Sequence, residues 1–248
     1  VYTFVVRQGL IFAGGSGGVY LSSNDGHTWH RTVNGFPTEP PYLTVTLSLL
    51  ASDSVLYAGT RSNGLWMSTD GGVSWGKDSS VAATPYGGYY DICAMVEAGG
   101  EIYIGTQDGG VFRRSKVGGE WQQLNSGLGD SPYVTAFTVR GYDIVAASRN
   151  GVFRLSGSDT VWSPLLTEAP AAVSVRTVGS MGRSLFLTVS APYYAGTILS
   201  LYQSTDVGTS WRRDTAIEVN DISTLYSFGD SLYAIGGGRL YLSVDTGS

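Results

Sequence analysis

Apolar residues in this chain fall in short runs that end at glycine or small polar residues, and no stretch keeps the 3.6-residue spacing of a helix. One kind of run recurs along the whole chain, at residues 11–14, 56–59, 102–105, 144–147, 185–188 and 232–235. A second run follows each of them and carries an aromatic at a fixed place, in turn Tyr20, Trp66, Phe112, Phe153, Tyr202 and Tyr241. These aromatics are 46, 46, 41, 49 and 39 residues apart. The pattern predicts a repeat protein built from strands.

Each repeat holds four strands. A further strand precedes each recurring run, as in residues 2–6 and 134–139, and a fourth begins at a tryptophan, as in residues 121–124. Four strands in a period of about 40 to 50 residues predict one blade of a β-propeller. We therefore predict an all-β, six-bladed β-propeller that forms a single domain, with approximate blades at residues 1–41, 42–90, 91–133, 134–174, 175–221 and 222–248. The last blade stops before its outer strand, and we expect residues beyond Ser248 to supply it, because natural propellers avoid an exposed edge.

A short polar motif, Ser-x-Asp/Asn-x-Gly-x-Thr/Ser-Trp, precedes the fourth strand of several repeats. Its complete copies contain Ser22, Asn24, Gly26 and Trp29; Ser68, Asp70, Gly72 and Trp75; and Ser204, Asp206, Gly208 and Trp211. A shortened copy contains Ser243, Asp245 and Gly247, and two worn copies keep Gly118 with Trp121, and Trp162. The Asp or Asn can bond its own turn, the glycine accepts a positive φ, and the tryptophan covers an apolar gap. We expect the five tryptophans to be equivalent and largely buried, each near the aromatic of its own blade.

These motifs resemble the Asp-box, or bacterial neuraminidase repeat, of sialidases, xyloglucanases, sortilin-type receptors and photosystem II assembly factors. The resemblance covers the whole chain as a repeat pattern and points to a superfamily of folds. It implies that the motif closes the turn between the third and fourth strands on the outer rim of a blade. Asp70, Asp206 and Asp245 are therefore assigned to structure, although a search for catalytic acids would select them first.

Composition narrows the classes of function. The net charge is −5 and the pI near 4.9, which argues against a nucleic-acid partner. No apolar run is long enough to cross a membrane, so we expect no membrane insertion. Cys93, His27 and His30 cannot form a disulfide or a metal centre, and we expect no metal or cofactor. Two lysines among many Gly, Ser, Thr and Tyr residues favour an exported bacterial protein, extracellular, at the cell surface or periplasmic, from which any signal peptide has already been removed.

Two loops are longer than the repeat requires and are rich in tyrosine. The loop within blade five carries Tyr193 and Tyr194, and the link after blade two carries Tyr86, Tyr89 and Tyr90. Blades two and five are opposite in a six-fold ring, so these rings would face each other across the channel mouth, with Arg61 and Arg149 nearby. Such rings suit stacking on sugars or packing on a protein partner. The alternative is that they only cover the channel.

An enzyme would need acids on the same face. Asp91 and Asp221 stand eleven residues before the second strand of their blades, and Asp108 and Glu168 complete the candidates. Two carboxylates across a channel could form an inverting glycosidase pair if they are about 6.5–9.5 Å apart. A sialidase-like enzyme would also need three arginines, for which Arg61, Arg149 and Arg176 are available, and a tyrosine nucleophile helped by a glutamate. The Arg-Ile-Pro segment typical of sialidases is absent, and no glutamate shares this register.

The sequence therefore favours a non-catalytic, exported or cell-surface binding module whose partner is a protein or a glycan. The main alternative is a glycoside hydrolase, sialidase- or xyloglucanase-like, that acts on a polysaccharide through Asp91, Asp108 or Asp221. A structural element of a bacterial surface assembly is the third possibility. The sequence leaves the oligomeric state and the ligand open.

Overall fold

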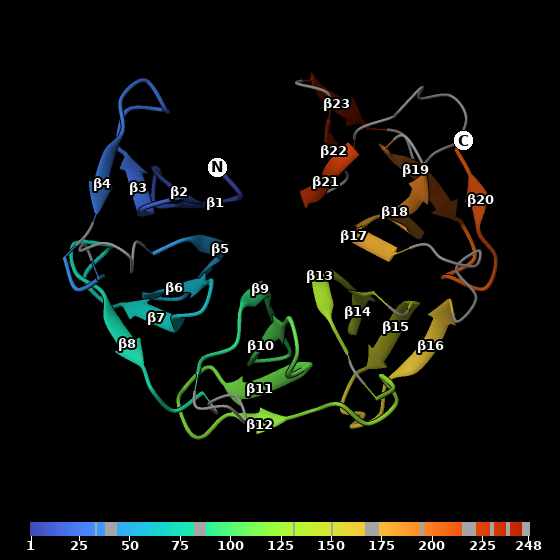
Figure 1. Ribbon diagram of the computed structural model, residues 1–248, viewed down its shortest axis with the longest axis horizontal. Coiled ribbons are helices and arrows are strands. Elements are labelled where there is room, and N and C mark those ends of the chain that lie inside the picture. Colours follow the sequence, from blue (N-terminus) through green and yellow to red (C-terminus); the bar gives the residue numbers. More distant parts are fainter. Residues whose placement is uncertain are drawn as a thin grey trace. The chain divides into compact units, whose positions relative to one another are not determined.

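The computed structural model describes residues 1–32, 34–37, 44–81, 88–130, 132–149, 151–166, 174–193, 196–214, 222–228, 231–236 and 239–244, with backbone alone at 191–193, 196–199, 223 and 228. These residues form six antiparallel sheets (Figure 1). Five sheets have four strands, and the described part of the last has three, which confirms the predicted six-bladed propeller. Two compact units, Val1–Gln123 and Leu124–Ser248, each contain three sheets. The prediction of a single domain with the stated blade limits stays a prediction.

The strands of the first unit follow one another in sequence within each sheet. Its sheets are β1 (Thr3–Arg7), β2 (Leu10–Gly15), β3 (Gly18–Ser22) and β4 (His30–Thr32); β5 (Thr46–Ser52), β6 (Val55–Thr60), β7 (Gly64–Ser68) and β8 (Gly76–Asp78); and β9 (Ile92–Ala98), β10 (Glu101–Thr106), β11 (Val111–Ser115) and β12 (Gln122–Gln123). First strands of successive sheets contact each other, β1 with β5 and β5 with β9.

The second unit repeats this plan. Its sheets are β13 (Val134–Arg140), β14 (Asp143–Ser148), β15 (Gly151–Ser156) and β16 (Ser163–Leu166); β17 (Ser174–Met181), β18 (Ser184–Tyr193), β19 (Gly196–Ser204) and β20 (Arg212–Arg213); and β21 (Ile222–Phe228), β22 (Ser231–Gly236) and β23 (Arg239–Ser243). The strand β13 contacts β17, and β17 contacts β21.

The second strand of each sheet forms much of the core. In β6, β10 and β14 every residue after the first is buried, because neighbouring sheets cover both faces of the strand. Space there is tight. A Cβ on Gly59 of β6 would lie 2.6 Å from Cγ2 of Ile92 at the start of β9, so glycine lets the next sheet approach.

The polar motifs form the turns between third and fourth strands. In the second copy, Ser68 Oγ donates to Asp70 Oδ1 (2.8 Å) and accepts from Gly72 N (2.8 Å), while Ser74 N donates to Asp70 Oδ1 (2.9 Å). Gly72 has φ of 88°, in the left-handed region. The same bonds recur in the copies at residues 22–28 and 204–210. The turn geometry of the motif and its side-chain hydrogen bonds therefore both stabilise the fold.

The tryptophans divide into two groups, which corrects the expectation that all five are largely buried. Trp75, Trp121 and Trp162 are buried, and their indole N–H groups donate outside their own turns, to Thr32 Oγ1, Asp78 Oδ2 and the Leu124 carbonyl. Trp29 is 40% exposed and Trp211 is half-buried, and each donates instead to the glycine carbonyl of its own turn. The more exposed rings are thus those whose indole N–H stays within their own turn.

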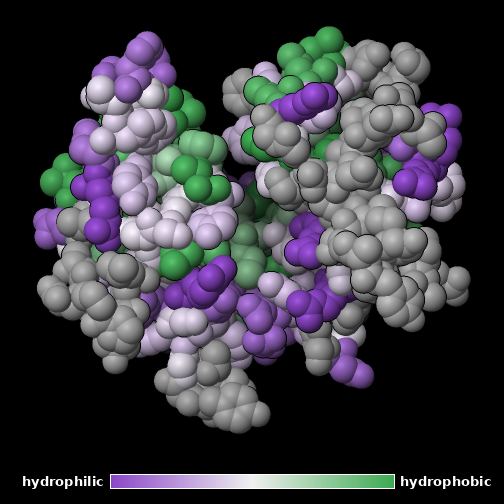
Figure 2. All heavy atoms as spheres, turned by 45° about the horizontal axis from the view of Figure 1, so that its top comes forward, coloured by the Kyte–Doolittle hydropathy of each residue, from purple (hydrophilic) through white to green (hydrophobic). Residues whose placement is uncertain are grey.

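The three-stranded sheet carries exposed apolar side chains. Leu240, Leu242 and Val244 are 65%, 56% and 70% exposed, and Figure 2 shows hydrophobic residues on the surface here, at the upper right of the view. Asp245 and Gly247 of the shortened motif, and the predicted continuation after Ser248, lie outside the described residues.

Candidate functional site

Most of the described residues that the sequence singled out for function lie at one end of their sheets. It is the end where the first strand begins and the second strand ends, and we call it the top end. The same backbone bond marks it in three sheets: Arg61 N to Val45 O (2.9 Å), Gln107 N to Asp91 O (3.0 Å) and Arg149 N to Tyr133 O (3.0 Å). The tight turns after the second strands hold these residues at fixed places.

Asp91 fastens two sheets together at their top ends. Its Oδ1 accepts from Ser62 N (2.7 Å) and Ser62 Oγ (3.2 Å), and its Oδ2 lies 4.0 Å from Arg61 Nε. Ser62 has a positive φ of 57°, so the carboxylate caps a turn that its backbone alone would not favour. The Asp91 carboxylate, one of the three acids named for the hydrolase hypothesis, thus has a structural role.

The other candidate acids are not brought into a described pair. Asp108 is exposed on the turn between β10 and β11. Asp221 and Glu168 lie outside the described residues. The structure therefore assigns no catalytic carboxylate pair among the residues it describes.

The tyrosines near Asp91 differ in their surroundings. Tyr90 is half-buried, and its ring lies 5.7 Å from that of Phe112, so it belongs to the core between β6 and β10. Tyr89 is 37% exposed, and the Lys77 ammonium lies 3.3 Å from the centre of its ring. One face of the Tyr89 ring is thereby occupied by a cation. Tyr86 and Tyr194 lie outside the described residues, and Tyr193 is described by its backbone alone at the end of β18.

A pocket of about 260 Å³ lies between the top ends of the β13–β16 and β17–β20 sheets. Its lining comprises Tyr133, Thr135, Arg149, Ser174, Val175 and Arg176. The Arg149 guanidinium lies 4.4 Å from the centre of the Tyr133 ring, and Arg176 Nε donates to Ser190 Oγ (3.0 Å). Arg149 and Arg176 were both candidates from sequence, whereas their convergence in one pocket depends on packing between sheets.

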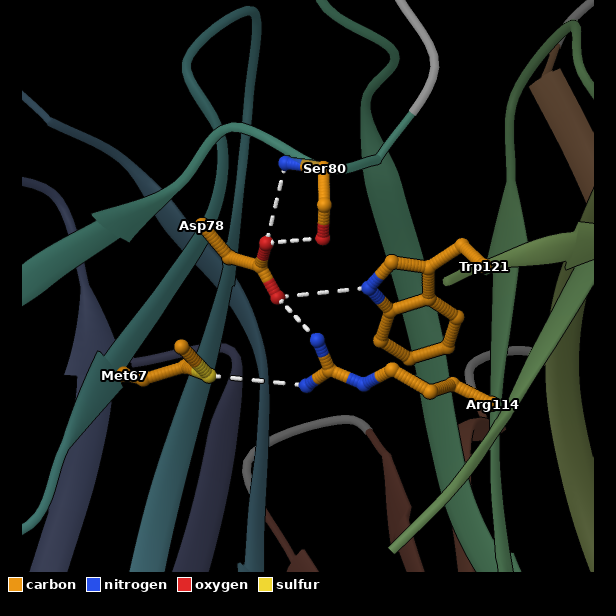
Figure 3. Close-up of polar contacts among 5 residues, drawn as sticks. All are labelled: Met67, Asp78, Ser80, Arg114 and Trp121. Atoms are coloured by element: carbon orange, nitrogen blue, oxygen red, sulfur yellow. Dashed lines mark hydrogen bonds and ion pairs between the residues drawn. The ribbon is translucent and has the colours of Figure 1, made fainter. Parts of the chain in front are cut away.

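A buried polar cluster joins the second and third sheets (Figure 3). Arg114 Nη1 lies 2.7 Å from Asp78 Oδ2, and both side chains are less than 10% exposed, at 9% and 5%. Trp121 Nε1 donates to the same oxygen (3.2 Å), and Ser80 N donates to Oδ1 (3.0 Å). The Arg114 guanidinium also stacks on Trp121, 4.5 Å from the ring centre, and Nη2 contacts Met67 Sδ at 3.5 Å.

Burial raises the pKa of Asp78, but hydrogen bonds from Ser80 and Trp121 and the charge of Arg114 outweigh it, so that pKa lies below its ordinary value. Arg114 Nη1, Trp121 Nε1 and Ser80 N all bond the Asp78 carboxylate inside the protein, and we assign the cluster to stability. Sequence reasoning missed it, although a signal was present. Arg114 stands where complete motifs have their first serine.

Within the described residues, no three His, Cys, Asp or Glu side chains gather closely enough to hold a metal ion. The described part of the chain also contains no helix with the length and apolar character of a bilayer span.

No family model matches the chain. A xyloglucanase from Hypocrea jecorina is 26% identical over 243 residues, which are 94% of this chain and 28% of the relative. Among solved structures, an ancestral GH74 enzyme aligns with a TM-score of 0.75 at 18% identity, covering 98% of this chain and 36% of the enzyme. The chain thus spans about a third or less of these two proteins.

Two further structures have the same fold. The extracellular domain of a hybrid two component system protein from B. thetaiotaomicron aligns with a TM-score of 0.74 at 16% identity, over the whole of this chain and 32% of that one. YCF48 from Cyanidioschyzon merolae aligns with a TM-score of 0.56 at 14% identity, over 97% of this chain and 94% of YCF48. These likenesses establish the fold of this chain, a six-bladed β-propeller with enzymes and binding proteins among its structural neighbours.

Proposed function

We propose that this chain is a non-catalytic binding propeller that recognises a glycan or a protein at the top ends of its sheets. The observation that carries this proposal is the use of Asp91, whose two carboxylate oxygens face Ser62 and Arg61 and fasten neighbouring sheets. An acid held in this way is poorly placed to exchange protons with a substrate. The pocket beside Arg149 offers a concave surface at the same kind of strand end.

Several finer features belong to the same proposal. We assign the ligand surface to Tyr86, Tyr89, Tyr90, Tyr193, Tyr194, Arg61 and Arg149, and the turn motifs to the Asp-box type. An exported location fits the extracellular structural neighbour. A protein ligand has a parallel in YCF48, a structure of which contains a bound D1 peptide.

A glycoside hydrolase is the second candidate, because the relative at 26% identity is a xyloglucanase. The acids would then be Asp91, Asp108 or Asp221. The chain spans 28% of that relative, so a complete active site need not lie within it.

One experiment separates these candidates. The purified chain is incubated with xyloglucan and with neutral and acidic oligosaccharides, and both bound ligand and newly formed reducing ends are measured. Binding without new reducing ends supports the binding module. Hydrolysis that is lost in Asp108→Asn would overturn it and establish the enzyme.

The ligand surface is tested with Tyr89→Ala and with a Tyr193→Ala/Tyr194→Ala double variant. We expect weaker binding in at least one of them and no change in Val73→Ser, since Val73 is 67% exposed within a rim turn. If binding survives both tyrosine variants and fails in the rim variant, the binding surface lies at the rim.

A further inference from the structure

The repeat allows residues at two junctions between sheets to be compared position by position. Ile92 pairs with Thr106 at the end of β10, and Val175 pairs with Val189 at the equivalent place in β18. Asp91 precedes the first of these residues and Ser174 precedes the second, so the two hold the same repeat position.

Arg61 and Arg149 likewise hold the same repeat position. Arg61 follows the last residue of β6, Arg149 follows the last residue of β14, and both backbone N–H groups make the marker bond of the top end. At the junction of the second and third sheets, Arg61 therefore faces Asp91. At the junction of the fourth and fifth sheets, Arg149 shares a pocket with Ser174. At this junction a serine stands at the position that Asp91 holds at the other one, and this serine lines the pocket.

The pocket is consequently cationic. None of its described lining residues is acidic, and Arg149 and Arg176 are both exposed with no described carboxylate within 4 Å of either. Each guanidinium is nevertheless held in place. The Tyr133 ring supports the flat face of Arg149, and Ser190 holds Nε of Arg176, which leaves terminal N–H groups of both for a ligand.

We propose that this pocket binds the carboxylate of an acidic sugar, which takes the place that the Asp91 carboxylate occupies at the equivalent junction. Two oriented guanidiniums match a planar carboxylate through charge-assisted, forked hydrogen bonds. The proposal rests on the binding function above and names its ligand class.

The size and lining of the pocket favour a sugar over an acidic peptide. About 260 Å³ is slightly below the usual range for pockets that enclose a drug-sized ligand, and it suits a single sugar ring. A protein partner would require a wider surface with an apolar centre. Here hydroxyls of Thr135 and Ser174 accompany the arginines, and Val175 is the one aliphatic residue of the described lining.

The test is calorimetric titration with tetragalacturonate and with its methyl ester, which keeps the hydroxyls and lacks the charge. We expect tetragalacturonate to bind, the ester to bind at least about tenfold more weakly, and Arg149→Gln and Arg176→Gln each to weaken tetragalacturonate by about tenfold or more. Affinity should also fall as salt is raised. The matched control is Arg183→Gln, an exposed arginine in the turn between β17 and β18, at the other end of the same sheet.

The sharpest variant is Ser174→Asp, which rebuilds the Asp91 arrangement without removing an arginine. We expect it to abolish tetragalacturonate binding while the thermal midpoint stays the same or rises. Equal binding of acid and ester, or full binding by Ser174→Asp, would overturn the proposal. So would an acetylated, amidated tetraglutamate peptide that binds as tightly as tetragalacturonate, since the ligand class would then be wrong.

The outcome also separates this inference from the proposed function. Binding of neutral xyloglucan oligosaccharides by the unaltered chain and by all three pocket variants, without binding of tetragalacturonate, would refute the acidic-sugar pocket and keep the binding function. Release of reducing ends from any of these sugars would refute the non-catalytic function instead.

Discussion

Replacing Asp78 with asparagine tests whether the buried cluster holds the second and third sheets together. The substitution keeps the shape of the side chain and removes its charge, so that Arg114 remains buried without its counter-ion. Removing one partner of a buried ion pair costs about 3–5 kcal/mol. The Trp121 ring still faces the guanidinium, which places the expected loss near the lower limit, about 3 kcal/mol.

The assay is equilibrium unfolding in urea followed by tryptophan fluorescence, for which Trp121 lies inside the cluster. The cycle is completed by Arg114→Met and by the double variant. Because the double variant leaves no unpaired charge, its loss of unfolding free energy should be smaller than the sum of the single losses by about 1 kcal/mol or more. The matched control is Asp53→Asn, which breaks an ion pair whose acid is 70% exposed and should cost less than about 1 kcal/mol.

The pH dependence of the cluster has a definite sign. The pKa of Asp78 is lower in the folded protein than its ordinary value of 3.8, so its contribution to stability is complete above that value and is lost as the pH falls below it. Asp78→Asn should therefore be less acid-sensitive than the unaltered chain. A loss below about 1 kcal/mol at pH 7, or additive single losses, would refute the assignment of this cluster to stability.

Three further outcomes follow from the fold. Trp75→Ala should cost about 3–5 kcal/mol in urea unfolding, and Trp29→Ala much less, because the first ring is buried and the second is 40% exposed. Hydrogen bonds from its own turn lower the pKa of Asp70 to about 2, so an NMR titration should show the amide bonded to this carboxylate shifting as pH falls from 4 to 2, while the amide bonded to Asn24 stays unchanged. Gly59→Ala should cost about 1–3 kcal/mol, since its Cβ would overlap the next sheet, and a neutral result would contradict the close approach.

The fold could be predicted from sequence because the residues that specify it lie close together in the chain and recur at regular intervals. Each blade carries a buried second strand, a fixed aromatic and a turn motif whose residues bond one another within a few positions. Such bonds are encoded by spacing alone. The structural role of Asp91 could not be predicted in this way, because its partner Ser62 lies 29 residues earlier and is reached only across a sheet junction.

The environments of the tryptophans could not be predicted for a related reason. The motif fixes where each ring begins, but residues outside the motif decide how far the ring is covered. Trp75 finds the Thr32 hydroxyl at 3.2 Å, whereas Trp29 bonds its own turn and contacts Phe4, a residue that is itself 48% exposed. A repeat thus predicts equivalent positions without predicting equivalent neighbours.

In a repeat protein, equivalent positions that hold different residues can point to function. Where Arg114 replaces the motif serine, Asp78 of the preceding sheet supplies the counter-charge, and the departure is compensated inside the protein. Where Ser174 stands at the position of Asp91, the described residues supply no counter-charge to Arg149, and a pocket is present. The two arginines of this pocket are exposed but held in place by Tyr133 and Ser190, so they can offer oriented N–H groups to an anionic ligand. By this reasoning the junction of the fourth and fifth sheets is a better candidate for a functional site than the acids that a search for carboxylates would select.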